Sequence, residues 1–247
     1  MVATTTQTTP QPSAPAPPVT RVLTVGDGVM FDLEPAVAAA FGATTVTTPR
    51  AYFGMGLSRP EQWDWRAGWR DELAAVHPDV VVVLQGVWDA RAVTVDSQTY
   101  VPGTTDWARW YAGLVNEALD LLTSTGGEVV WVSTLAEASA DKADAIAAVN
   151  RVAHTVVAGH RAARWLDADA ALARTPNTSR PTVGPDGSAV PVRKLDGEHL
   201  CAEGAARLAS AVRDVARSDF VVSTDDGWRT AAWRHDPRYG TRDGCEG

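Results

Sequence analysis

Long hydrophobic runs and blocks of positive charge are both missing from this sequence of 247 residues. Its most hydrophobic run, Val80–Leu84, has the length of a strand, whereas a membrane-spanning helix needs roughly 18 to 20 apolar residues. The formal net charge is -8, from 22 Lys and Arg against 30 Asp and Glu, and no cluster of Lys or Arg is present. Since a nucleic-acid binder needs a basic face that neutralises phosphates, nucleic acid is excluded as an expected partner.

Cysteine is also scarce, because the chain holds only Cys201 and Cys245. A domain of about 200 residues buries enough apolar surface to fold without disulfides or metal ions, so the pair is not required for folding. In a chain that begins without an export signal, the residues alone favour two reduced thiols.

The first twenty residues lack the parts of a secretory signal. Residues 1–20 contain no Lys or Arg and no apolar segment, and they are rich in Pro and Thr. Such a segment favours extended conformers and buries little apolar surface, so we expect a flexible tail. With neither an export signal nor a membrane span, a soluble cytoplasmic protein is the default expectation.

Phe and Tyr are few, with four each, whereas Trp occurs ten times. Trp65 and Trp69, like Trp107 and Trp110, have helical spacing and are expected to lie mostly in the core or along a groove. Trp63 precedes the first of these pairs, and with some of the others it could form a platform that stacks on a sugar ring.

Segments of strand and helix length alternate along the chain, which predicts a parallel sheet covered by helices on both faces. We expect one domain over residues 21–220 between two tails, 1–20 and 221–247. Strands are predicted at residues 22–25, 44–47, 79–84, 128–133 and 164–166. Helices are predicted at residues 30–41, 61–76, 106–124, 141–157 and 204–217. Residues 85–105 show no period, so they are predicted to form a long, functional loop.

Ligands of an open α/β sheet bind beyond the carboxyl ends of its strands. Three segments are expected there: residues 26–28, residues 86–89 and residues 196–200. The last contains Asp196-x-x-His199. This spacing can place the carboxylate against one imidazole nitrogen and leave the other nitrogen as a general base.

Four short segments together resemble the sequence blocks of the SGNH/GDSL hydrolase superfamily, and the resemblance spans residues 21–217. They are residues 25–30 (Val-Gly-Asp-Gly-Val-Met), the loop with Gly54 and Gly56, Gly86-x-Trp88-Asp89, and Asp196-x-x-His199-Leu200. The sequences of these segments are most similar to those of the SGNH domains attached to bacterial membrane O-acyltransferases.

This resemblance implies a flavodoxin-like three-layer α/β sandwich. It also implies hydrolysis or transfer of acyl esters on carbohydrate or cell-envelope hydroxyls, with no metal or organic cofactor. Related domains lie outside the cytoplasm, so the resemblance implies an extracytoplasmic location, a membrane acyltransferase as a possible partner, and a possible Cys201–Cys245 disulfide that tethers the tail. Reduced thiols remain the alternative.

Two positions depart from the family pattern. The family's catalytic Asp and His fall on Asp196 and His199, but its nucleophilic serine falls on Gly28 and its third-block asparagine on Trp88. Without a hydroxyl at residue 28 no acyl-serine can form. The backbone N–H of Gly28, the indole N–H of Trp88 and a second-block glycine, Gly54 or Gly56, are the candidate oxyanion donors.

The missing serine leaves two functional hypotheses open. One is an SGNH-type hydrolase or O-acyltransferase relative with impaired serine chemistry, in which Ser58, Asp27 or a water activated by His199 replaces the nucleophile. The other is a non-catalytic module that keeps the cleft for an acyl or sugar ligand. Asp89 either binds a substrate hydroxyl or only begins a turn, and Cys201 is expected to face helix packing.

Overall fold

A computed structural model describes residues 16–136, 140–172, 181–183, 189–240 and 244–245. Its centre is a parallel five-stranded sheet with the order β2-β1-β3-β6-β7. These strands are Val46–Ala51 (β2), Arg21–Gly26 (β1), Val80–Leu84 (β3), Glu128–Val132 (β6) and Ala163–Leu166 (β7). The predicted parallel sheet is therefore confirmed, and the tail predicted at residues 1–20 lies mostly outside the described residues.

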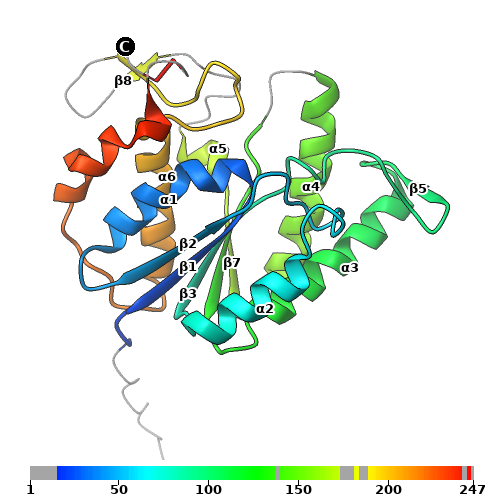
Figure 1. The fold of residues 1–247 in the computed structure, drawn as a ribbon, viewed down its shortest axis with the longest axis horizontal. Helices are drawn as coiled ribbons and strands as arrows, with labels where there is room; N and C mark the ends of the chain where they lie inside the picture. The colour runs from blue at the N-terminus through cyan, green and yellow to red at the C-terminus, as the bar shows by residue number, and fades with distance from the viewer. Residues whose placement is uncertain (1–15, 137–139, 173–180, 184–188, 241–243, 246–247) are drawn as a thin grey trace, which may run out of the picture.

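Helices cover both faces of the sheet and make three layers (Figure 1). On one face lie α1 (Gly28–Phe41) and α6 (Ala202–Ala216), and on the other lie α2 (Trp65–Val76), α3 (Thr105–Leu122) and α4 (Ala140–Gly159). A short helix, α5 (Ala168–Ala171), follows β7. The flavodoxin-like α/β sandwich that the resemblance implied is the observed fold.

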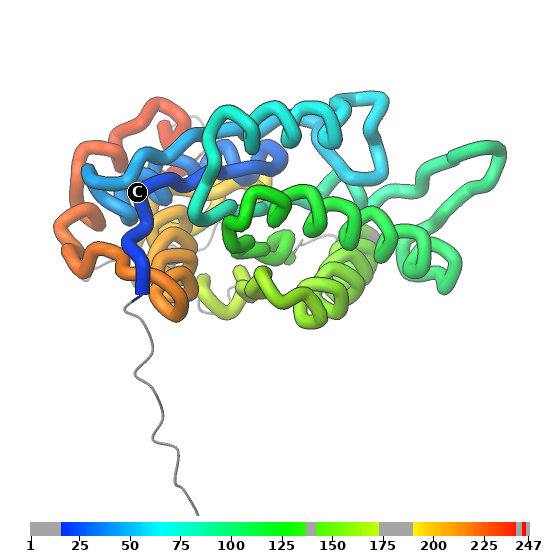
Figure 2. Tube along the Cα trace, turned by 90° about the horizontal axis from the view of Figure 1, so that it is seen from below, coloured from blue at the N-terminus to red at the C-terminus, as the bar shows by residue number. Residues whose placement is uncertain are grey.

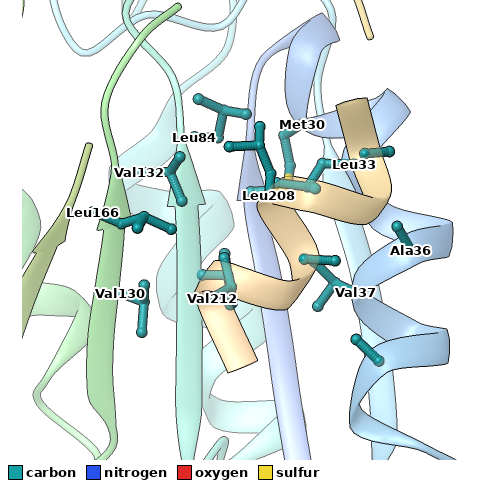
Figure 3. Packing of buried hydrophobic residues seen from close by; sticks show 14 of the residues in the cluster. Met30, Leu33, Ala36, Val37, Leu84, Val130, Val132, Leu166, Leu208 and Val212 are labelled. Carbon is teal, nitrogen blue, oxygen red and sulfur yellow. The ribbon is translucent and has the colours of Figure 1, made fainter. Parts of the chain in front are cut away.

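The central strand β3 explains why two cores form. All five of its residues are buried, and because strand side chains alternate, they divide between the faces. Val80, Val82 and Leu84 enter the core beneath α1 and α6, whereas Val81 and Val83 enter the core beneath α2, α3 and α4. Figure 3 shows the first core, in which α1 and α6 pack on β3 and β6.

Some boundaries of strands and helices differ from the predictions, because polar residues there interrupt the hydrophobic periodicity. The second strand is β2 rather than residues 44–47, because it is a half-exposed edge strand without alternating burial. Helix α1 begins at Gly28 rather than residue 30, since Asp27 caps it by accepting a hydrogen bond from Val29 N. Similarly, Asp64 caps α2 at Trp65.

The predicted loop over residues 85–105 contains an antiparallel hairpin formed by β4 (Val93–Val95) and β5 (Gln98–Tyr100). It projects beyond the layered body of the molecule, as Figures 1 and 2 show. A second small hairpin pairs β8 (Pro181–Val183) with β9 (Ala189–Pro191) ahead of α6. Among the described residues, no helix has the length and apolar character needed to cross a membrane.

The C-terminal segment folds back onto α1. It contains three 3-10 turns, η1 (Gly227–Thr230), η2 (Ala232–His235) and η3 (Pro237–Tyr239). Trp228 and Tyr239 are buried in the core beneath α1 and α6, and the Tyr239 hydroxyl donates to the backbone oxygen of Asp32. A disulfide joins Cys201, which precedes α6, to Cys245, so the segment is fixed at both its packing contacts and its end.

This disulfide predicts a stability difference. The bridged cysteines are 44 residues apart, and closing a loop of that size typically stabilises a fold by about 2 to 4 kcal/mol. For a domain of this size, Cys245→Ser should lower the melting temperature by about 5 to 15 °C under non-reducing conditions. Circular dichroism melts measure the difference. A reductant should lower the melting temperature of the parent protein but leave that of the variant unchanged. Equal melting temperatures in the absence of reductant would contradict the bridge.

Candidate active site

Asp196 and His199 form a hydrogen-bonded pair in the loop that leads into α6. Asp196 Oδ2 lies 2.8 Å from His199 Nδ1, while Oδ1 accepts hydrogen bonds from the backbone N–H groups of Glu198 and His199 at 2.9 and 3.0 Å. Burial works to raise the pKa of Asp196, but these N–H groups and the imidazole outweigh it and hold the pKa below its ordinary value. The ionised carboxylate therefore accepts the Nδ1 proton and leaves Nε2 as the basic nitrogen.

The basic nitrogen of His199 faces residue 28. A Cβ atom added at Gly28 would lie 3.0 Å from His199 Nε2 and 3.1 Å from the ring of Phe53. Residue 28 is the first residue of α1, directly beyond the carboxyl end of β1. The structure thus brings together Gly28, Asp196 and His199, the three positions that sequence reasoning aligned with a serine, an acid and a base.

A pocket of about 360 Å³ opens beside this pair. Besides Asp196 and His199 it is lined by residues that sequence reasoning did not select: Phe31, Asp32, Phe53, Lys194 and Arg238. Asp32 could have been recognised from the sequence as a site residue, because it lies one helical turn after Gly28 in an otherwise apolar helix start. Arg238 carried none, since only the folding back of the C-terminal segment brings it to the pocket.

Asp32 fixes the loop that holds the Asp196–His199 pair. Its carboxylate is buried, Oδ1 lies 3.0 Å from Lys194 Nζ, and Oδ2 accepts a hydrogen bond from Leu200 N at 3.0 Å. Burial raises the pKa of Asp32, while the charge of Lys194 opposes the rise. One side chain of α1 therefore grips the loop on both sides of Asp196 and His199.

Arg193 also holds the loop that carries Asp196 and His199. Its guanidinium is fully buried, pairs with Asp169 at 2.9 Å, and donates to the backbone oxygen of Gly197 at 3.0 Å. A buried guanidinium with several acceptors has little freedom to move, so the turn around Gly197 is held in one conformation. This support was also missed from sequence.

Asp27 lies behind Gly28 and does not line the pocket. Its side chain is buried and accepts hydrogen bonds from Val29 N at 3.0 Å, Gly86 N at 3.2 Å and Val87 N at 3.4 Å. Burial raises the pKa of Asp27 to about 7, although these N–H groups act in the opposite direction. The carboxyl joins the turns after β1 and β3 through these bonds to backbone N–H groups.

Asp89 and Ser58 are bonded to each other inside the protein. Asp89 is 0 % exposed and accepts hydrogen bonds from Ser58 Oγ at 2.6 Å and from the Tyr111 hydroxyl at 2.9 Å. Ser58 is 2 % exposed. This burial and the bond to Asp89 do not favour Ser58 as a replacement nucleophile, and Asp89 holds the loop of residues 57–58.

The two second-block glycines differ in their surroundings. A Cβ atom at Gly56 would lie 2.8 Å from Asp89 Oδ1, so only glycine fits there beside the buried carboxylate. Gly54 has a φ of +84° and nothing within 4 Å of its Cβ position. Gly54 therefore lies in the left-handed region that favours glycine, and neither environment identifies an oxyanion donor.

Trp88 is half-buried beneath Arg91, whose guanidinium lies 4.3 Å from the centre of the indole ring. Phe53 and His199 line the pocket beside Gly28, but Trp88 does not. Its role as a hydrogen-bond donor to a reacting oxygen stays a prediction. In the part of the chain that the structure describes, no group of three His, Cys, Asp or Glu side chains gathers as metal ligands.

Comparisons with known proteins agree with this fold. A family model described as "Protein of unknown function (DUF459)" matches residues 21–215, and no curated protein matches the chain. An α/β hydrolase, LAE5, from the metagenome of Lake Arreo in Spain superposes with a TM-score of 0.58 at 14% identity, covering 81% of this chain and 96% of that one.

Two further solved structures are similar over most of their length. A GDSL-like lipase from Bacteroides thetaiotaomicron has a TM-score of 0.55 at 16% identity and covers 81% of this chain and 88% of its own. A catalytic mutant of an acetylxylan esterase from Geobacillus stearothermophilus has a TM-score of 0.56 at 14% identity, with 85% and 99% covered. At these identities the likeness shows the fold alone, which is the fold of SGNH hydrolases.

The environment of Asp27 predicts an unusual titration. In carbon-13 NMR of aspartate-labelled protein, the carboxyl signal that disappears in Asp27→Asn should titrate with a midpoint near 7, against an ordinary value of 3.8. Because the folded pKa exceeds the unfolded one, this group's contribution to stability is complete below pH 4 and is lost as the pH rises through 7. A midpoint near 4 would contradict the effect of burial.

Proposed function

The chain belongs to the DUF459 family, and from this premise and the geometry of the pocket we propose that it is an acyl-ester hydrolase or O-acyltransferase relative whose serine chemistry is impaired. Its substrates would be acyl esters, such as acetyl esters, of carbohydrate or cell-envelope hydroxyls. The observation that carries the proposal is the position of His199 Nε2, 3.0 Å from where a side chain at residue 28 would begin.

This arrangement supports base catalysis with water as the nucleophile. A water molecule above Gly28 would attack the ester carbon while its proton passes to His199 Nε2, and the same proton would then leave with the alcohol. Asp196 stabilises the imidazolium that forms between the two steps. The donors proposed for the developing oxyanion are the backbone N–H of Gly28, the backbone N–H of Gly54 or Gly56, and the indole N–H of Trp88.

Hydrolysis with water as the nucleophile is slower than hydrolysis through serine, because no covalent acyl-enzyme divides the reaction into two easier steps. In serine hydrolases, loss of a triad member leaves roughly 10³- to 10⁴-fold catalysis over water. We therefore expect slow hydrolysis. The partner that the family resemblance implies is a membrane acyltransferase, which would supply acyl groups.

A non-catalytic binding module is the second candidate. It is supported by Phe53, whose ring lies 3.1 Å from the Cβ position of Gly28 and so lies beside the space that a serine side chain needs. Cys201, the nearest thiol in sequence to His199, is in a disulfide, and the Ser58 hydroxyl is bonded to Asp89. In this candidate the pocket holds an acyl or sugar ligand without turnover.

Restoring the hydroxyl separates the two candidates. Gly28→Ser should raise the hydrolysis of 4-nitrophenyl acetate by at least about a hundredfold over the parent, because His199 then has an alcohol to deprotonate. Gly28 is the first residue of a helix, so its backbone accepts a side chain, and the added Cβ atom requires the rings of His199 and Phe53, 3.0 and 3.1 Å away, to shift by a few tenths of an ångström.

Gly28→Ala is the matched control, because it adds the same Cβ atom without the hydroxyl. It should show no gain, and His199→Ala in the Gly28→Ser background should remove the gain. If Gly28→Ser is folded and no faster than Gly28→Ala, the proposed hydrolase site is wrong and the binding module is favoured.

A further inference from the structure

Two consecutive aromatic residues are exposed at the edge of the sheet that carries the His199 pocket, where Tyr52 N donates to Gly26 O at 2.8 Å. Phe53 is 69 % exposed although it lines the pocket, and Tyr52, the preceding residue, is 38 % exposed. Few large apolar side chains are exposed in the described part of the chain, and one of them, Phe53, lines the pocket in which His199 Nε2 faces residue 28. Such a placement suits ligand contact better than chance exposure.

Other side chains hold both rings in place. Tyr52 stacks on Trp63 with ring centres 4.0 Å apart and planes 17° apart, and Trp63 itself packs against Gly68 of α2. Phe53 contacts Phe31, with ring centres 5.1 Å apart. Each exposed ring therefore rests on a second aromatic ring, so it is presented to solvent in a fixed orientation.

Arg238 completes the support of this surface. Its guanidinium lies 4.0 Å from the centre of the Phe31 ring and donates to the backbone oxygen of Phe31. The C-terminal segment thus clamps Phe31, and Phe31 in turn supports Phe53. A rigid ring loses little entropy on binding, which favours affinity.

The surroundings favour a sugar over a lipid chain. An acyl chain is best held in an enclosed apolar cavity, whereas the pocket beside Phe53 is lined by Asp32, Lys194, Asp196 and Arg238. A pyranose ring has an apolar C–H face that stacks on an aromatic ring and hydroxyl edges that bond to charged groups. With a net charge of -8, the protein also lacks the field that would attract an anionic lipid surface.

We propose that Tyr52 and Phe53 form a binding platform for the sugar rings of an oligosaccharide whose acyl ester lies beside His199. This inference rests on the proposed function for the position of the ester but not for the binding itself. It makes a carbohydrate chain, longer than a single residue, the ligand of this surface.

Binding of acetylated xylohexaose, followed by isothermal titration calorimetry and by tryptophan fluorescence, tests the platform. Because Trp63 stacks under Tyr52, sugar binding should change the fluorescence. Tyr52→Ala and Phe53→Ala should each weaken binding by roughly two- to tenfold, the usual effect of losing one aromatic contact. Acetylated xylobiose should bind more weakly than the hexaose.

Two further variants make the result specific. Val46→Ala removes another exposed apolar side chain, on β2, and should leave binding unchanged. Phe53→Leu keeps an apolar side chain but removes the ring, so it should weaken sugar binding as much as Phe53→Ala. If Phe53→Leu binds as the parent does, the surface recognises apolar groups in general and the sugar platform is wrong.

The outcomes distinguish this inference from the proposed function. No detectable binding of the hexaose, or binding that Tyr52→Ala and Phe53→Ala leave unchanged, overturns the platform even if Gly28→Ser hydrolyses 4-nitrophenyl acetate. Binding that depends on both rings supports the platform even if Gly28→Ser is inactive, in which case only the hydrolase proposal fails.

Discussion

The grip of Asp32 on the loop of residues 194–200 is the interaction on which the site depends. Asp32 belongs to the helix that begins at Gly28, and its two oxygens hold Lys194 and Leu200 on either side of the Asp196–His199 pair. Helix α1 thereby sets the distance between residue 28 and His199 Nε2. The same residue's backbone oxygen accepts from Tyr239, so the C-terminal segment and its disulfide are tied to one point of α1.

Near this contact, the buried carboxylates hold loops and turns together, whereas the Asp196–His199 pair is accessible from the pocket. Asp27 joins the turns after β1 and β3, and Asp89 holds the loop that carries Ser58. Both are enclosed and surrounded by donors. Asp196 is exposed and His199 is half-buried, and both line a pocket, so this pair combines a fixed geometry with access to a ligand.

The sheet and its helices could be predicted because strands such as Val80–Leu84 are uniformly apolar and helices such as α1 follow a turn after a strand. The pairing of Asp196 with His199 could also be predicted, since it depends on residues three positions apart. The role of Asp89 could not, because its partners Ser58 and Tyr111 are 31 and 22 residues away. Arg238 lies beyond the resemblance in sequence, and it reaches the pocket only through the packing of Tyr239 and Trp228.

We propose that residue 28 occupies the nucleophile position of a hydrolase site whose base is His199. Covalent labelling of Gly28→Ser with a fluorophosphonate, followed by peptide mass spectrometry, tests it most directly. We expect one adduct per molecule, at position 28, formed far more slowly when His199 is also replaced by Ala. An adduct at another residue, or labelling of position 28 at the same rate without His199, would contradict it.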